Sequence, residues 1–267
     1  MKEEGTTILG RYRVESCLMR TPAGRVLKAL DLNGGEPVMV KELMADSALA
    51  VTPEEIRERY EREVLALSAL KHPGIPRLLY HEASSSACYL VEEFFTGETL
   101  DALSMKRNRP FTVKEVVGWG VQLCEMLALF HSHKPEPIIF RDVTPSNIVV
   151  SAPGVVKLAD FGLSRFFNPL KVKDTFVMGT PGFSPPEQYG SGQSDARSDI
   201  YSLGATLYYC LTLRSVDEFP RQVPGPRTHN PLVSGPLDKA VVLCLSREPS
   251  RRPQSAEKLS EMLKNLL

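Results

Sequence analysis

A short predicted hairpin at residues 148–158 is the feature that most limits how this chain can fold. It consists of an apolar β-branched run, four turn-forming residues and a second apolar run. The hairpin returns the chain on itself, so we expect Asn147, which precedes it, to lie beside Asp160, which follows it. Amide and carboxylate oxygens suit a hard cation such as Mg²⁺. Asp142, five residues before Asn147, can accept a proton from a hydroxyl nucleophile. The pattern predicts one site for a metal ion and a proton.

The bulk composition excludes several classes of function. The 267 residues include 32 basic and 32 acidic side chains, which is not the charge balance of a protein that binds nucleic acid or an anionic membrane. No run reaches the roughly eighteen apolar residues of a membrane span, and the N-terminus lacks an apolar signal core. Five cysteines without a Cys-x-x-Cys pair favour a reducing compartment, with most of them in the core, and argue against a zinc site. We expect a cytoplasmic protein without a nucleic-acid partner or a membrane segment.

The first third of the chain predicts a small antiparallel sheet with one helix. Thr52 is suited to cap this helix, Pro53 to its first turn and Glu55 to a capping box, and the pattern ends near Lys71. The predicted strands are the apolar runs at 11–18, 26–30, 38–43 and 88–92.

Two opposite charges stand on apolar faces of these elements. Alternation along residues 38–43 puts Lys41 on the same face as Met39, and Glu63 falls within the apolar stripe of the predicted helix. A buried carboxylate requires a partner, so a pair between Lys41 and Glu63 is one interpretation. An exposed lysine and a boundary glutamate are the alternative.

The remainder of the chain predicts mainly helices. A helical pattern runs from Val113 to His131, with Trp119 as a packing residue. His131 and His133 lack a partner at metal-ligand spacing, so we expect structural roles for them. The stretch 215–236 is rich in proline and glycine and predicts an ordered surface connection.

The segment Phe-Arg-Asp-Val-Thr-Pro-Ser-Asn at 140–147, followed by Asp-Phe-Gly at 160–162, resembles the catalytic loop and magnesium motif of the protein kinase superfamily. The eighteen residues from Asp142 to Asp160 match the family's spacing, and the resemblance covers about 10–263. Pro-Pro-Glu-Gln-Tyr at 185–189 is most similar to bacterial eukaryotic-like Ser/Thr kinases. The resemblance implies an α+β, bilobal fold, with a sheet-based N-lobe at 1–95 and a mainly helical C-lobe at 96–267.

The resemblance also implies roles for individual residues. Lys41, paired with Glu63, would grip the α- and β-phosphates of ATP. Asp142 would orient the acceptor hydroxyl, with Thr180 beside it, while Asn147 and Asp160 would hold Mg²⁺, or Mn²⁺ in its place. The remaining implied nucleotide contacts are Gly24, Val26, Met39, Glu93, Phe95 and Val149.

The chain departs from the family pattern at several of these positions. Met19 and Thr21 replace two glycines of the phosphate-binding loop, which predicts a looser hold on the nucleotide. Phe140 replaces a histidine at an apolar stacking position, at modest cost. Thr144 replaces a lysine, and losing that charge-assisted contact predicts a rate lower by roughly ten- to a hundred-fold. Glu92 takes a position at the back of the nucleotide pocket that is normally uncharged, where it requires solvent, a basic partner or a raised pKa.

The segment 179–187 resembles the activation segment of Ser/Thr-specific kinases. Thr175 is a candidate phosphorylation site with Arg141 as the receiving cation, and a solvated loop threonine is the alternative. By the same resemblance, Asp199 would support the catalytic loop and Arg252 would pair with Glu187.

These features predict a transferase that phosphorylates serine or threonine of protein substrates, including itself, with a homodimer for the autophosphorylation. The first alternative is a pseudokinase that binds nucleotide weakly and acts as a scaffold. The second is a small-molecule kinase of related fold, against which the length of the segment 179–187 argues.

Overall fold

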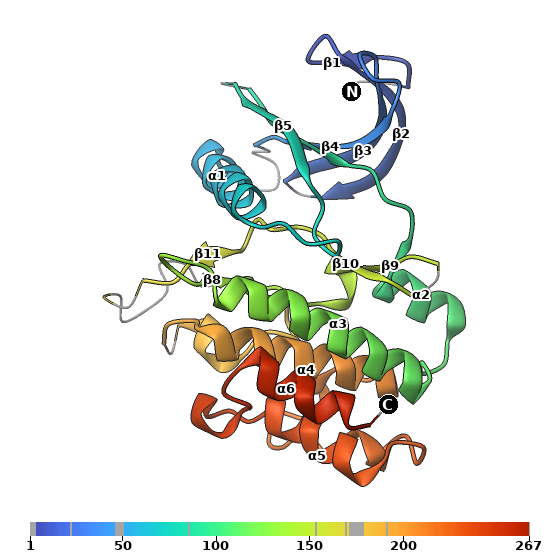
Figure 1. Ribbon diagram of the computed structural model, residues 1–267, viewed down its shortest axis with the longest axis vertical. Coiled ribbons are helices and arrows are strands. Elements are labelled where there is room, and N and C mark those ends of the chain that lie inside the picture. Colours follow the sequence, from blue (N-terminus) through green and yellow to red (C-terminus); the bar gives the residue numbers. More distant parts are fainter. Residues whose placement is uncertain are drawn as a thin grey trace. The chain divides into compact units, whose positions relative to one another are not determined.

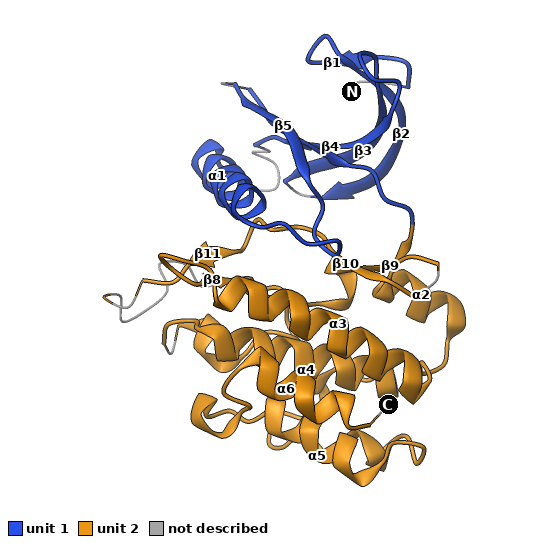
Figure 2. Cartoon of the chain, in the orientation of Figure 1, with its two compact units in different colours: residues 1–96 blue, residues 97–267 orange. Residues whose placement is uncertain are grey.

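The chain divides into two compact units, Met1–Thr96 and Gly97–Leu267 (Figure 2). The sequence places this division one residue earlier. The computed structural model describes residues 4–21, 23–45, 51–84, 86–152, 154–168, 170, 179–190 and 192–266. The first unit is built on an antiparallel sheet and the second is mainly helical, which is the α+β fold expected from the sequence.

The sheet of the first unit has the order β1-β2-β3-β4-β6-β5, and every neighbouring pair is antiparallel (Figure 1). The four predicted strands are present. The other two were not predicted, because β1 has only two residues and the residues of β5 are mostly exposed and show no alternation. The strands are β1 (Thr7–Ile8), β2 (Tyr12–Thr21), β3 (Gly24–Asp31), β4 (Pro37–Leu43), β5 (Leu78–Ala83) and β6 (Cys88–Glu93).

The two faces of β4 have different surroundings. Val38 and Val40 belong to an apolar cluster that includes Tyr12, Leu27 and Val91. Alternation therefore turns Met39 and Lys41 to the other face of the strand, as the sequence predicts.

The helix of the first unit, α1 (Pro53–Ala69), begins and ends close to the predicted residues. The Thr52 hydroxyl accepts the Glu55 backbone N–H, and the Glu55 carboxylate accepts the Thr52 N–H, so the predicted capping box is confirmed. The helix packs against β5 and β6 and buries Glu63 among apolar side chains (Figure 1).

The second unit is organised around α3 (Val113–His131), which begins and ends at the predicted residues. Trp119 is buried and meets the Phe111 ring edge-on, with centroids 5.0 Å apart, so its packing role is confirmed. The helices α4 and α6 pack against α3, and α5 packs against α4 (Figure 1). The other helices are α2 (Leu100–Arg107), α4 (Ala196–Thr212), α5 (Gly235–Cys244) and α6 (Ala256–Lys264).

Short strands and 3₁₀ turns complete the second unit. The predicted connection contains two 3₁₀ turns, Val216–Glu218 and Pro226–Thr228, and it ends earlier than expected because Ser234 caps α5. The remaining 3₁₀ turns are Pro145–Asn147, Pro186–Tyr189 and Pro249–Arg251. The strands are β7 (Glu98–Thr99), β8 (Ile138–Ile139), β9 (Ile148–Val150), β10 (Val156–Leu158) and β11 (Arg165–Phe166). They form a sheet β10-β9-β7 and a pair β11-β8.

Two expectations from composition can be compared with the structure. Four of the five cysteines are buried, as expected, and burial raises the pKa of the Cys244 thiol to about 12, which keeps it protonated. None of the helices described here is long and apolar enough to cross a membrane.

Candidate active site

The second unit brings Asp142, Asn147 and Thr180 into direct contact. The Thr180 hydroxyl donates to Asp142 Oδ1 at 2.7 Å, and the Asn147 side-chain amide donates to Asp142 Oδ2 at 2.6 Å. The same amide also donates to the Asp142 backbone carbonyl at 3.2 Å. Both oxygens of this carboxylate therefore have a fixed orientation.

The hairpin β9-β10 joins this group to Asp160. Ile148 pairs with Leu158, and the Ala159 N–H donates to the Asn147 carbonyl at 2.8 Å, so Asn147 and Asp160 lie at the same end of the hairpin. This arrangement is the one predicted from the sequence. The Asp160 carboxylate also accepts the Gly162 N–H at 3.1 Å. The oxygens of Asn147 and Asp160 are hard donors and fit a divalent cation such as Mg²⁺.

Two residues of this loop region have left-handed backbones, Arg141 with φ +71° and Asp160 with φ +61°. Side chains other than glycine adopt this region rarely, and such conformations occur often at functional sites. Here the left-handed residue Arg141 lies directly before Asp142. The left-handed backbone at Asp160 sets the direction of the Asp160 carboxylate at the end of the hairpin.

Asp199 in α4 supports the catalytic loop, as predicted. It is 0% exposed and accepts the backbone N–H groups of Phe140 at 2.9 Å and Arg141 at 2.6 Å. His131 Nε2 lies 2.8 Å from the same carboxylate, so the structural role expected for this histidine is confirmed. Three contacts from two other segments converge on one buried acid, which fixes the backbone that leads to Asp142.

Further contacts hold the loop from both sides. The Thr206 hydroxyl donates to the Val143 carbonyl at 2.7 Å, and the Gln188 amide donates to the Arg141 carbonyl at 3.0 Å. Sequence reasoning missed both, because their partners lie 63 and 47 residues away along the chain.

Phe140 occupies an apolar stacking position, as the sequence predicts. Its ring lies edge-on to Phe161, with centroids 5.1 Å apart, and tilted against Phe130 at 5.9 Å. All three side chains are fully buried. The aromatic cluster therefore joins the catalytic loop to the Asp160–Gly162 motif through packing.

The segment after Thr180 is secured by the predicted ion pair. Arg252 makes a bidentate contact with Glu187, with nitrogen–oxygen distances of 2.6 and 3.0 Å, and its side chain is 0% exposed. Ser198 donates to the same carboxylate at 2.8 Å. Gly182 has φ +79°, a backbone conformation that other residues rarely adopt, and a Cβ there would lie 2.0 Å from the Ser215 hydroxyl oxygen.

A pocket of about 790 Å³ opens beside this segment, within the second unit. Apolar side chains that include Val216, Val223 and Leu245 line it, together with Arg221 and Arg247. Pro181, the chain neighbour of Thr180, is also in its wall. Sequence reasoning did not predict this pocket.

The predicted pair between Lys41 and Glu63 is present in the first unit. Lys41 Nζ contacts Glu63 Oε1, and both residues are buried, at 5% and 1% exposure. Lys41 Nζ also lies 2.9 Å from Glu92 Oε1, and Glu92 is 0% exposed. Of the surroundings considered for Glu92, the structure shows the basic partner.

The other predicted nucleotide contacts of the first unit lie on the sheet. Val26 pairs with Lys41 across β3 and β4, and Met39 is buried on the same face as Lys41. Gly24 has φ +140°, and a Cβ there would lie 1.9 Å from the Glu42 carbonyl oxygen. The absence of a side chain at Gly24 is therefore required for the approach of β3 to β4, whatever its role toward a phosphate.

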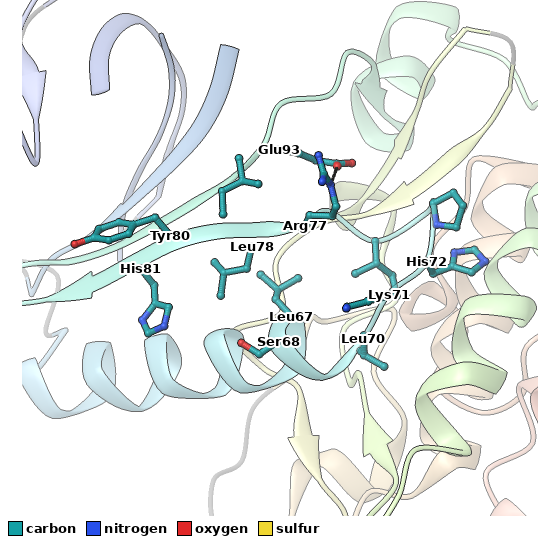
Figure 3. A pocket seen from close by; sticks show the side chains of 13 residues that line it. Leu67, Ser68, Leu70, Lys71, His72, Arg77, Leu78, Tyr80, His81 and Glu93 are labelled. Carbon is teal, nitrogen blue, oxygen red and sulfur yellow. Dashed lines mark hydrogen bonds and ion pairs between the residues drawn. The ribbon is translucent and has the colours of Figure 1, made fainter. Parts of the chain in front are cut away.

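Glu93 and Phe95, predicted as nucleotide contacts, lie two residues apart near the end of the first unit. The Glu93 carboxylate accepts the Arg77 guanidinium at 2.7 Å and lines a pocket of about 670 Å³ (Figure 3). Leu67 of α1 and Leu78 of β5 point toward one another in this pocket (Figure 3). Lys41 and Glu63 are not among its lining residues.

Three further positions from the sequence analysis are Val149, Thr175 and Thr144. Val149 is half-buried in β9 and pairs with Lys157 across the hairpin. Thr175, the candidate phosphorylation site, lies outside the described residues, so the contact expected between it and Arg141 stays a prediction. Thr144 is buried, and its hydroxyl lies 3.1 Å from that of Ser146.

Comparison with known proteins identifies the family. The family model described as the protein kinase domain matches residues 14–266. The DNA damage-responsive serine/threonine-protein kinase RqkA of Deinococcus radiodurans is 30% identical over 97% of this chain and 40% of its own length. Serine/threonine-protein kinase PrkC of Bacillus subtilis is 27% identical, covering 97% and 41%. Serine/threonine-protein kinase PknA of Mycobacterium tuberculosis is 32% identical, covering 78% and 48%.

This chain belongs to the protein kinase domain family. It spans less than half the length of these three curated relatives. The family uses ATP and a divalent metal ion, and acts on protein substrates.

Proposed function

We propose that this chain transfers the terminal phosphoryl group of ATP to serine or threonine hydroxyls of proteins. The observation that carries the proposal is the Asp142 carboxylate, held in one orientation by Thr180 and Asn147 at the end of the hairpin that leads to Asp160. Phosphoryl transfer depends mainly on positioning and electrostatics, and this group offers both.

Asp142, Asn147 and Asp160 of the second unit each have a defined part in the proposed reaction. The acceptor hydroxyl oxygen bonds to the γ-phosphorus, the bond from phosphorus to the bridging oxygen breaks, and ADP leaves. The hydroxyl proton passes to Asp142, which also orients the hydroxyl. Asn147 and Asp160 would hold the divalent cation, for which we propose Mg²⁺ with Mn²⁺ as a substitute. A cation bound there neutralises charge on the phosphates.

The first unit would supply the nucleotide contacts. Lys41, oriented by Glu63, would bind the α- and β-phosphates, as the kinase family does with this pair. The apolar side chains of Val26 and Met39 would contact the adenine. Gly24, Glu93 and Phe95 of this unit, together with Val149 of the second unit, complete the proposed set of nucleotide contacts.

The pocket next to Thr180 supports a polypeptide acceptor over a small molecule. Its volume of about 790 Å³ would accommodate several residues of an acceptor chain, and Pro181, the chain neighbour of Thr180, lies in its wall. Arg221 and Arg247 are exposed in its wall and make no ion pair among the described residues, so acidic side chains near the acceptor hydroxyl would be favoured. We therefore propose acceptors that combine an apolar side chain with acidic neighbours.

Met19, Thr21 and Thr144 predict weaker binding and a slower reaction, but the pseudokinase alternative is not favoured. The five groups that phosphoryl transfer most needs are all present: Lys41, Glu63, Asp142, Asn147 and Asp160. Incubation of the protein with radiolabelled ATP, Mg²⁺ and a generic acceptor protein tests the proposal. Incorporation by the wild-type chain but not by the Asp142→Asn variant is expected. Equal labelling in both proteins would contradict it.

Autophosphorylation, a homodimer that performs it and a cytoplasmic location are the remaining parts of the proposal. Mass spectrometry after incubation with Mg·ATP would locate any modified residue, including Thr175. A dependence of the initial rate on protein concentration would support reaction between two copies of the chain. A concentration-independent rate would exclude it.

A further inference from the structure

Two carboxylates contact one ammonium group inside the first unit. Lys41 extends from β4, Glu63 from α1 and Glu92 from β6. Lys41 Nζ contacts Glu63 Oε1 and lies 2.9 Å from Glu92 Oε1. The contact with Glu63 is the lysine–glutamate pair that the kinase family uses. The contact with Glu92 comes from a position where the family normally has no charge.

The sheet register explains why Glu92 meets Lys41. Met39 lies opposite Glu92 and Lys41 lies opposite Leu90 in the antiparallel pair of β4 and β6. Lys41 and Glu92 are therefore diagonal neighbours on one face, a separation that long side chains can bridge. Because Glu92 is 0% exposed, its carboxylate does not exchange this contact for water.

The opposite face of β4 shows a different balance. Glu42 is also buried, and its carboxylate accepts the Arg25 guanidinium at 2.5 Å and the Tyr89 hydroxyl at 2.8 Å. There one carboxylate has a cation and a hydroxyl as donors. Around Lys41, by contrast, two carboxylates contact the same ammonium group.

We propose that Glu92 competes with the phosphates of the nucleotide for Lys41 and thereby lowers the affinity for ATP. The inference rests on the proposed function of Lys41. An ammonium that already contacts two carboxylates attracts a third anion less than one that contacts Glu63 alone, and a phosphate that binds it must share or displace the Glu92 contact. Glu92 thus acts on the nucleotide through Lys41, as a positioning residue.

The Glu92→Gln variant tests the proposal, because it keeps the size of the side chain and removes its charge. The dissociation constant of a fluorescent ATP analogue is measured by titration, with and without Mg²⁺. We expect binding about tenfold tighter in the variant under both conditions, because Lys41 then contacts one anion fewer whether or not the metal ion is present. Glu82→Gln in β5 is the control, because Glu82 is exposed and bonds only to Tyr80 among the contacts described, and its affinity should equal that of the wild type.

The possible results separate the inference from the proposed function. Equal or weaker binding by Glu92→Gln, with clear binding by the wild type, overturns the inference alone. Weaker binding only when Mg²⁺ is present assigns Glu92 to the metal and also overturns it. Absence of binding by both proteins overturns the proposed function and the inference together.

Thermal unfolding gives a second readout that does not require nucleotide. Lys41→Met removes the cation that both carboxylates contact, so we expect a lower melting temperature. Addition of Glu92→Gln to that variant should recover at least about half of the loss, because one buried charge is then removed. A further decrease in melting temperature in the double variant would show that Glu92 has another source of stabilisation, and would contradict the competition for Lys41.

Discussion

The two units present their functional side chains in contrasting ways. In the second unit, hydrogen-bond donors from several segments surround each acid: Thr180 and Asn147 on Asp142, and backbone N–H groups with His131 on Asp199. In the first unit, two acids surround a single base, Lys41. In the second unit the donors therefore orient the functional carboxylate. In the first unit the two acids compete for the functional lysine.

Because of this difference, we expect substitutions in the two units to affect separate quantities, the rate of phosphoryl transfer and the affinity for nucleotide. A group oriented by neutral donors can act without first exchanging a partner, so substitutions in the second unit should change the rate of phosphoryl transfer. A charge shared among anions must redistribute its contacts when a ligand binds, so substitutions around Lys41 should change nucleotide affinity.

The largest expected effect is that of Asp142→Asn on catalysis. The amide retains the size of the carboxylate but does not accept the hydroxyl proton, and general-base groups contribute about 10²- to 10⁴-fold. We expect kcat to fall within that range with little change in KM for ATP, measured by radiolabel transfer to an acceptor protein. Asp101→Asn in the first turn of α2 is the control and should retain full activity. A large change in the nucleotide KM of Asp142→Asn would contradict the division of roles between the units.

Arg252→Ala should have the largest effect on stability. It removes one partner of a buried bidentate ion pair and leaves Glu187 buried, which costs about 3–5 kcal/mol. Urea unfolding measures the loss. Arg251→Ala is a matched control, because its side chain is 71% exposed and pairs only with Glu248 among the described contacts, so a change below about 0.5 kcal/mol is expected. Similar losses in both variants would show that the Glu187 pair contributes little.

Gly24→Ala distinguishes a packing role from a phosphate-binding role in the first unit. The added Cβ would meet the Glu42 carbonyl oxygen, and the backbone has φ +140°, so we expect a loss of about 2 kcal/mol or more in the free energy of unfolding without any ligand. Gly34→Ala meets nothing closer than 4.0 Å and should be nearly neutral. If Gly24→Ala weakened ATP binding and left unfolding unchanged, the packing explanation would be wrong.

The smallest expected effect concerns the acceptor pocket of the second unit. Val223→Asp places a charge in its apolar wall, which should raise KM for an acceptor protein about tenfold without altering KM for ATP. Leu232→Asp is the control, since this side chain is 84% exposed and outside the pocket. Steady-state kinetics with both substrates varied would separate the two constants. An unchanged acceptor KM would place polypeptide binding elsewhere.

Local patterns predicted much of the architecture. The capping box of Thr52 and Glu55, the extent of α3 and the hairpin after Asn147 depend on residues near one another in the chain. Local chemistry was sufficient in these cases, since the geometry of a helix or a strand relates neighbouring residues directly. The contact of Lys41 with Glu63 was one of two interpretations of two charges on apolar faces, and the kinase resemblance implied it.

Other features required the folded chain. The residues of β5 are mostly exposed and lack the alternation that predicts a strand. The helix α5 begins within a segment whose prolines and glycines predict a connection. Glu92 was recognised as a misplaced charge, but the choice of Lys41 as its partner depends on the register between two strands. The convergence of His131 on Asp199 joins residues 68 positions apart, and the pocket beside Pro181 is formed by several separate segments.

The sequence by itself determined which chemical groups this kinase-family chain has and their order: the paired acids and amide around one hairpin, the buried lysine, and the helix with its glutamate. Only the tertiary structure decided how those groups are balanced, with Asp142 held by neutral donors and Lys41 shared between Glu63 and Glu92. The physical reason is that periodicity specifies which face a side chain takes. Partner choice on that face depends instead on strand register, helix packing and the exclusion of water.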